Sequence, residues 1–142
     1  MQTVRSLLEG KPGALYTVDA EDPVRVAIQL MADHHIGALP VMRGAELAGI
    51  ISERDYARKV VLLGRNSRET QVWQIMTAPV TTVGPDDAVQ HCMKLMTENR
   101  FRHLPVLDAG TLTGMISIGD CVRAVIEAQQ HEIDELKRYI AT

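Results

Sequence analysis

Residues 36–41 read Ile-Gly-Ala-Leu-Pro-Val, and residues 49–55 read Gly-Ile-Ile-Ser-Glu-Arg-Asp. Both phrases return 65 residues later, within Arg-His-Leu-Pro-Val at 102–106 and Gly-Met-Ile-Ser-Ile-Gly-Asp at 114–120. The offset of 65 holds without a gap from Thr17 to Arg58. Ungapped matches that cluster in this way indicate an internal duplication, and the fold must be built from the repeated unit.

Each half of the duplication has the same order of predicted elements. A short extended piece, at 16–18 or 81–83, comes before a helix whose apolar residues recur every three or four positions. A hairpin follows, with its turn at 43–45 or 108–110. A second helix then begins at Glu53 and runs to about Leu63, or begins at Ile118. The order strand, helix, strand, strand, helix predicts an α+β fold.

One such unit has fewer than about 60 residues and would bury too little surface to be stable alone. We therefore expect two pseudo-twofold-related units that pack through their sheets, with two related clefts between them. The polar stretch 64–71 is a plausible connector. The predicted division is residues 1–71 for the first unit with its lead-in and connector, 72–130 for the second unit, and 131–142 for a C-terminal helical extension.

The composition limits the possible functions. A formal charge of −3 argues against a general nucleic-acid binder, which needs a basic surface. No apolar run approaches the roughly 20 residues that span a bilayer, and the N-terminus does not look like a signal peptide. Two cysteines are too few for a disulfide scaffold or a zinc site. We expect a cytoplasmic protein with neither nucleic acid nor membrane as a partner.

The motif Gly-hydrophobic-hydrophobic-Ser-x-x-Asp after a Leu-Pro-Val strand, present in both halves, resembles the CBS domain. The resemblance covers about residues 4–130 and implies a stand-alone tandem pair, called a Bateman module. It also implies a regulatory role: members commonly bind AMP, ADP, ATP, NAD or S-adenosylmethionine and regulate an attached or partner protein. We expect an adenine nucleotide as the bound ligand, no catalytic cofactor and no enzymatic activity.

The same motif has a physical interpretation of its own. A strand that runs into a helix presents unpaired N–H groups beside a partial positive charge, which suits an anion. Ser52 and Asp55 lie on one face of the first helical turn, and Arg54 offers a charge to a phosphate. The alternative is a plain capping box, in which the serine and the aspartate only complete the helix start. The spacing alone leaves both roles open, and they can coexist.

The resemblance implies that Asp55 and Asp120 bind ribose, and that Ser52 and Ser117 lie near ribose or phosphate. Backbone groups near Ala38 and His103 would read the purine edge, and Arg102 and His103 would contact phosphate. Gly37 and Ala38 carry no charge in the first unit, and Gly119 replaces Arg54 in the second, so the clefts should be unequal. Lys11, Arg58 and Lys59 are weaker ligand candidates, and we interpret them as solvated surface charges. The expected ligand contacts are Tyr16, Thr17, Ala38, Pro40, Ser52, Arg54, Asp55, Val80, Thr81, Arg102, His103, Pro105, Ser117 and Asp120.

The last predicted helix continues beyond the repeat. Its apolar positions step by four, three, four, three and four, with one polar member, through Val122, Ile126, Gln129, Ile133, Leu136 and Ile140. This spacing is a heptad seam. Because the resemblance to the CBS family implies that such modules commonly pair, we expect self-association as a homodimer through this seam. The alternative is a helix that folds back on its own core. The seam is barely three heptads long, so it cannot be the sole contact between two copies.

Overall fold

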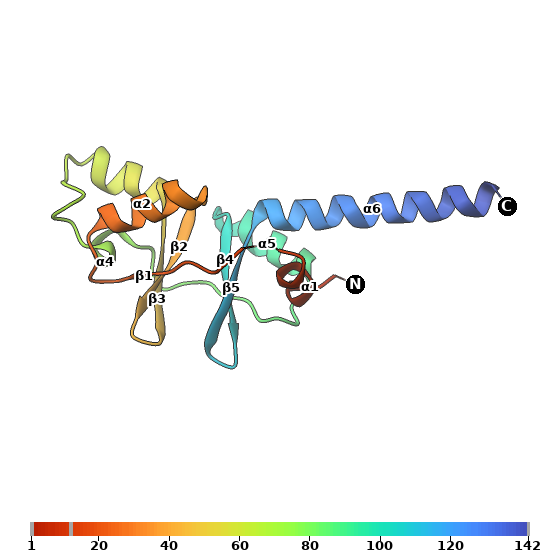
Figure 1. Ribbon diagram of the computed structural model, residues 1–142, viewed down its shortest axis with the longest axis horizontal. Helices are drawn as coiled ribbons and strands as arrows, with labels where there is room; N and C mark the ends of the chain where they lie inside the picture. The colour runs from red at the N-terminus through yellow and green to blue at the C-terminus, as the bar shows by residue number, and fades with distance from the viewer. Residues whose placement is uncertain (1, 12, 142) are drawn as a thin grey trace.

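The computed structural model describes residues 2–11 and 13–141 and contains two α+β units that lie side by side (Figure 1). A short helix, α1 (Val4–Glu9) or α4 (Val72–Ile75), precedes each unit. The first unit contains β1 (Val18–Asp19), α2 (Val24–His34), β2 (Ala38–Arg43), β3 (Glu46–Ser52), α3 (Glu53–Tyr56) and the π-helix η1 (Ala57–Val61). The second contains α5 (Val89–Asn99), β4 (His103–Asp108), β5 (Thr111–Ser117) and α6 (Ile118–Ala141).

The two hairpins have the same register, which confirms the duplication at the level of single residue pairs. Ala38 lies opposite Ser52, and 65 residues later His103 lies opposite Ser117. Each hairpin also has an irregularity at the same place, directly after Val41 and directly after Val106. In the first unit β1 adds a parallel strand beside β2. The predicted fold class is confirmed.

The predicted helical faces are the buried ones. Helix α2 buries Val24, Ala27 and Met31, and α5 buries the equivalent Val89, Cys92 and Met96. These side chains pack on the strands, so each unit has an aliphatic core of its own. The helices end alike, on His35 and Arg100, whose φ values of 53° and 58° are in the left-handed region that often closes a helix.

Two predicted elements differ in the structure. The expected strand at 81–83 is reduced to a single bridge between Val83 and Val106. The expected helix from Glu53 changes to a π-helix after its first turn and ends at Val61, with Leu62 and Leu63 in a turn. A π-helix is rare, and the regular spacing of apolar residues does not reveal one.

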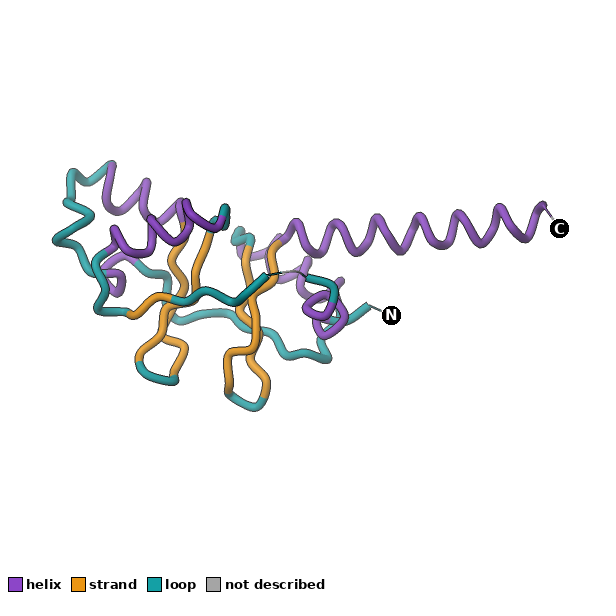
Figure 2. Tube along the Cα trace, viewed as in Figure 1, coloured by secondary structure: helices purple, strands orange, loops and turns teal. Residues whose placement is uncertain are grey.

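The two lead-in helices are exchanged between the units. Val4 of α1 is buried in the core of the second unit, whereas Val72 and Ile75 of α4 are buried in the core of the first. The chain consequently crosses between the units twice, after α1 and after α4 (Figure 2). The division by packing therefore differs from the division of the sequence at residue 71. Each unit is completed by residues from the other half.

The long helix α6 begins in the second unit and then leaves it. Cys121 and Ala124 are buried against the unit, but the rest of the helix projects away from both units (Figure 1). The alternative in which this helix folds back on its own core is therefore wrong. Among the described residues no helix combines the length with the apolar character that crossing a bilayer would require.

Candidate functional site

Two cavities lie between the units and are related by the same offset of 65 residues. The basic cleft has a volume of about 620 Å³ and contains Ser52 and Asp55 of the first unit together with Arg102 and His103 of the second. The second cleft has a volume of about 530 Å³ and contains Ser117 and Asp120 together with Gly37 and Ala38. The paired clefts expected from the duplication are therefore present.

At the start of α3, Ser52 and Asp55 form a reciprocal cap. The backbone N–H of Asp55 donates to Ser52 Oγ at 3.1 Å, and the backbone N–H of Ser52 donates to Asp55 Oδ2 at 3.0 Å. The hydroxyl of Ser52 also donates to Oδ2 at 3.0 Å. The capping role is therefore real. Asp55 nevertheless lines the basic cleft, so the cap and the cavity wall are the same residues.

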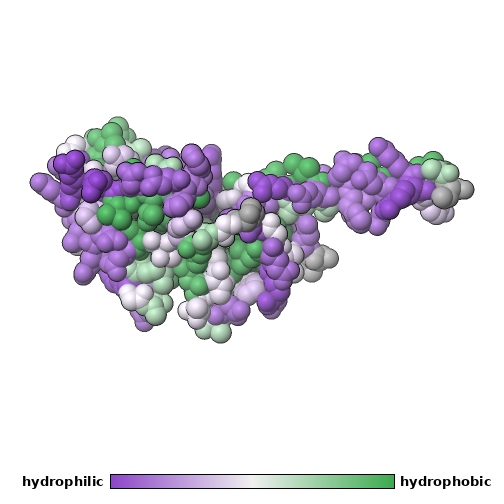
Figure 3. All heavy atoms as spheres, in the orientation of Figure 1, coloured by the Kyte–Doolittle hydropathy of each residue, from purple (hydrophilic) through white to green (hydrophobic). Residues whose placement is uncertain are grey.

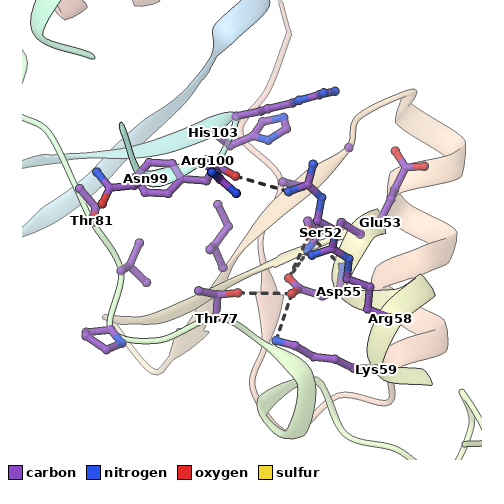
Figure 4. Close-up of a pocket in the computed structure, with 18 residues that line it drawn as sticks. Ser52, Glu53, Asp55, Arg58, Lys59, Thr77, Thr81, Asn99, Arg100 and His103 are labelled. Atoms are coloured by element: carbon purple, nitrogen blue, oxygen red, sulfur yellow. Dashed lines mark hydrogen bonds and ion pairs between the residues drawn. The ribbon is translucent and has the colours of Figure 1, made fainter. Parts of the chain in front are cut away.

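The other oxygen of Asp55 is held by residues that come later in the chain. Thr77 Oγ1 donates to Oδ1 at 3.3 Å, and Lys59 Nζ lies 3.1 Å from the same oxygen (Figure 4). The interpretation of Lys59 as a solvated charge is wrong, because it pairs with a carboxylate that is 8% exposed. Thr77 follows α4 and was not expected here. A ribose hydroxyl that bound Asp55 would have to replace one of these two contacts.

Asp120 has the same cap in the second cleft but a different cation. Its backbone N–H donates to Ser117 Oγ at 3.1 Å, and the N–H of Ser117 donates to its Oδ2 at 2.8 Å. Lys11 Nζ lies 2.8 Å from Oδ2 and also donates to the carbonyl of Met115. Lys11 is exposed, as expected for a surface charge, but its ion pair with Asp120 was not expected. Among the described residues no hydrogen bond reaches Asp120 Oδ1, which leaves that oxygen available to a ligand.

Burial alone would raise the pKa of Asp120, but the hydrogen bonds from Lys11 and Ser117 and the charge of Lys11 hold this pKa below its ordinary value. A lowered pKa means that the ionised carboxylate stabilises the fold above the unfolded-state pKa. That contribution is lost as the pH falls through the folded-state pKa. Lys11, more than 100 residues away in the chain, is thus the main partner of this acid.

We expect Lys11→Met to raise the pKa of Asp120, because burial then acts without its main opposing charge. The variant should be less stable near neutral pH, and it should lose less stability than the parent protein as the pH falls, because the folded-state pKa of Asp120 no longer lies so far below the unfolded-state value. Carboxyl carbon chemical shifts followed by NMR against pH measure the first effect, and urea unfolding at several pH values measures the second. An unchanged Asp120 titration would show that Lys11 does not control this carboxylate.

The basic cleft carries a strong excess of positive charge. Five lysine and arginine side chains line it against two carboxylates, those of Glu53 and Asp55; the cations are Arg54, Arg58, Lys59, Arg100 and Arg102. Arg54 also donates to the backbone carbonyl of Arg100 at 3.4 Å, so it joins the two units. Figure 4 shows His103 and Arg100 on the side of the cavity that faces Ser52 and Asp55. The first-unit motif and the second-unit basic cluster therefore meet in one cavity.

The second cleft has a different character. Its wall includes Tyr16, whose ring stacks on that of His34 with centroids 3.7 Å apart and an interplanar angle of 16°. Lys11 and Asp120 are its charged pair, and they neutralise each other. His103 lines both clefts. Burial, followed by the charge of Lys11, lowers the pKa of His103 and favours the neutral imidazole. The expected inequality of the two clefts is thus present in their charges.

Most of the residues expected from the sequence line one of the clefts. The basic cleft brings together Ala38, Ser52, Arg54, Asp55, Val80, Thr81, Arg102 and His103. The second cleft contains Tyr16, Pro40, Ser117 and Asp120, and it shares Ala38 and His103. Thr17 and Pro105 line neither. Glu53, Thr77 and Asn99 also line the basic cleft, but the sequence analysis did not name them as ligand contacts. Arg58 lines it as well, although it was interpreted as a surface charge. Glu53 and Arg58 lie within or next to the serine–aspartate motif, and this is the signal that could have identified these two residues.

The remaining reactive side chains are not arranged for chemistry. Cys92 and Cys121 are fully buried, and burial raises the pKa of each thiol to about 11, so both are protonated core residues. Within residues 2–11 and 13–141 no three His, Cys, Asp or Glu side chains gather in a way that would hold a metal ion.

Comparison with known proteins agrees with this geometry. A signal-transduction-type CBS protein from Burkholderia ambifaria MC40-6 is 54% identical, with a TM-score of 0.86 over 90% of this chain and 96% of that one. The protein CBSX3 of Arabidopsis thaliana, named as mitochondrial, is 46% identical over 125 residues. That match covers 84% of this chain but 61% of CBSX3. The cytoplasmic location therefore stays a prediction.

A more distant structure shares the fold. The CBS domain pair of the protein MJ0100, solved in complex with 5′-methylthioadenosine and S-adenosyl-L-methionine, is 23% identical with a TM-score of 0.76. The match covers 89% of this chain and 98% of that one. The CBS domain family model matches residues 14–62 and again residues 72–127, one match for each half of the duplication. With the repeat, the paired clefts and these matches in agreement, the chain belongs to the CBS-domain family and contains a tandem pair of its domains.

Proposed function

We propose that this CBS pair is a regulatory module that binds an adenosine-containing nucleotide in the basic cleft. The observation that carries the proposal is the composition of that cleft. Apolar side chains of Ile50, Val80 and Phe101 line the same cavity of about 620 Å³ as the five cations. A pocket of a few hundred Å³ with apolar walls and a few polar groups is typical of small-molecule sites. A nucleotide would place its flat heterocyclic base against the apolar side chains and its phosphates against the cations.

The basic cleft favours ligands with phosphate groups, such as AMP, ADP, ATP or NAD. Arg54 and Arg102 approach from different units, so a phosphate between them would neutralise both and hold the units in one relative position. The second cleft, with its charges paired, suits an adenosyl compound with fewer phosphates or none. The MJ0100 pair, which binds two adenosyl compounds, supports this class of ligand.

Regulation requires that the ligand binds one arrangement of the two units better than another. We propose that a separate protein reads this arrangement and that the module acts as a homodimer. Catalysis is not part of the proposal. A purified ligand-loaded module is the reagent with which to search for that protein.

Isothermal titration with AMP, ADP, ATP and NAD tests the proposal directly. We expect at least one to bind and the affinity to rise from AMP to ATP, because each added phosphate meets further cations in the basic cleft. The melting temperature should rise with ligand concentration. Absence of heat and of any thermal shift with all four would overturn nucleotide sensing and favour a constitutive adaptor, in which the serine–aspartate motifs only cap helices.

A further inference from the structure

The projecting half of α6 exposes a continuous apolar stripe. The exposed fractions of its apolar members range from 41% at Val122 to 80% at Ile140. Figure 3 shows hydrophobic surface on the upper side of this helix, beyond the body of the two units. We call this stripe the apolar seam; it consists of Val122, Ile126, Gln129, Ile133, Leu136 and Ile140.

We propose that the apolar seam pairs with the same seam of a second copy, with the two helices parallel and in register. The proposal concerns how two copies associate, so it does not depend on the nucleotide. In heptad terms, Ile126, Ile133 and Ile140 occupy the a positions, and Val122, Gln129 and Leu136 occupy the d positions. Side chains at a and d are the ones that interdigitate between two helices.

The polar member of the seam favours the parallel arrangement. In a parallel, in-register pair Gln129 faces Gln129 of the second copy, and the two amides can donate and accept a hydrogen bond between them. In an antiparallel pair the same amide would face an apolar residue and lose that bond. A single polar residue in a seam is known to specify register at some cost in stability. Gln129 is exposed in the single chain, so the pair would supply its partner.

The charges beside the apolar seam also favour the parallel arrangement. Glu132 lies at a g position and Lys137 at the following e position, five residues later. In a parallel pair the g side chain of one helix approaches this e side chain of the other, so two Glu132–Lys137 ion pairs would form by symmetry. An antiparallel pair would instead bring Glu132 toward Glu132.

Neither Glu132 nor Lys137 has an ion pair among the described residues, although their neighbours do. Asp134 accepts a hydrogen bond from Gln130, and Glu135 lies 3.0 Å from His131. Both of these pairs join residues four apart on the same helix. Asp134 and Glu135 thus have partners on their own helix, whereas Glu132 and Lys137, which flank the seam five residues apart, are placed to pair with a second copy.

Disulfide trapping at the end of the seam tests the orientation. In the parallel pair the two copies of Ile140→Cys face each other and should link on mild oxidation. In an antiparallel pair that overlaps from 122 to 140, the same two residues would be about 27 Å apart, from 18 residues at about 1.5 Å each, far beyond disulfide reach. Arg138→Cys, two residues away on the opposite face, is the matched control and should not link. The native thiols are buried and do not compete.

A charge exchange tests the register through reversible association. Glu132→Lys should weaken the dimer on the order of tenfold by sedimentation equilibrium, because two attractions become two repulsions. Lys137→Glu should do the same, and the double exchange should restore parental affinity. Glu127→Lys carries the same charge change outside the seam and should have little effect. Circular dichroism of each variant verifies that α6 is still helical.

Two results would overturn the proposal. One is a parent protein that stays monomeric up to the highest concentration tested. The other is cross-linking in a mixture of Ile126→Cys and Leu136→Cys chains without cross-linking of Ile140→Cys, which indicates antiparallel pairing. Nucleotide titration of the same samples keeps the two proposals separate, because loss of the dimer leaves both clefts complete within each chain.

Discussion

Replacing Arg54 and Arg102 together with glutamine is expected to weaken ATP binding by about 100-fold, on the basis of about 1.5–3 kcal/mol for each charged hydrogen bond, discounted for exposure. The two guanidinium groups enter the basic cleft from different units. Phosphates bound between them gain two charge-assisted contacts at once. AMP should lose less affinity than ATP, since it has fewer phosphates to share between the arginines. Isothermal titration of both ligands against both proteins measures the difference.

The control for this prediction is a second double variant with the same change in net charge. Arg25 and Arg43 are exposed and line neither cleft. Arg25→Gln with Arg43→Gln should therefore leave ATP affinity near the parental value. Equal losses in the two double variants would mean that ATP senses the overall charge of the chain rather than this cleft. Urea unfolding of the first variant is also needed, because Arg54 bridges the units through the Arg100 carbonyl.

The site owes its asymmetry to a few substitutions between the two copies of the repeat. Arg102 and His103 stand where the first unit has Gly37 and Ala38, and Gly119 stands where it has Arg54. Because each cleft combines the helix start of one unit with the strand approach of the other, Arg54 and Arg102 line the basic cleft and not the second one, whereas the neutral His103 lines both. The duplication produced two similar cavities, and these exchanges give one of them an excess of positive charge.

The sequence was sufficient to predict the features that depend on local pattern. The hairpins, the buried faces of α2 and α5 and the equivalence of the two halves follow from the spacing of apolar residues and from the repeated Leu-Pro-Val phrase. The capping role of Ser52 and Asp55 also follows from spacing, and the structure shows it together with a position in the cavity wall. The Ser-x-x-Asp spacing determines the hydrogen bonds at the start of a helix, and these do not depend on the rest of the fold.

Features that depend on distant contacts could not be predicted in this way. Lys11 pairs with Asp120 although more than 100 residues separate them in the chain, and the local sequence around either residue does not indicate this ion pair. The exchange of α1 and α4 between the units likewise depends on where the chain crosses from one unit to the other, which the local sequence pattern does not specify. Lys59 lies four residues from Asp55, a spacing that often forms ion pairs on a helix, so this contact could have been found.

The largest expected loss of stability concerns a pair of equivalent glycines with unequal surroundings. A Cβ added at Gly49 would lie 2.9 Å from the backbone oxygen of Thr77 and 2.6 Å from Met76 Sδ. The Thr77 backbone is fixed there by two hydrogen bonds with Ile50, of 3.1 and 2.8 Å. For a Cβ at Gly114 the three nearest atoms all belong to the side chain of Leu8, with Cδ2 at 2.6 Å. A side-chain end can rotate away, whereas a hydrogen-bonded backbone cannot.

We therefore expect Gly49→Ala to lower the free energy of unfolding by about 2–3 kcal/mol, as overpacking in a rigid setting does. Gly114→Ala, the matched control, should change it by less than about 1 kcal/mol, because the new methyl group also removes some of glycine's entropic cost in a strand. Urea unfolding of the two variants gives the comparison. Displacement of Thr77 in Gly49→Ala should also disturb its contact with Asp55 and weaken ligand binding in the basic cleft. Equal losses of stability at the two glycines would mean that the backbone at Thr77 moves as easily as the Leu8 side chain. The contact between Thr77 and Asp55 would then not depend on a rigid segment after α4.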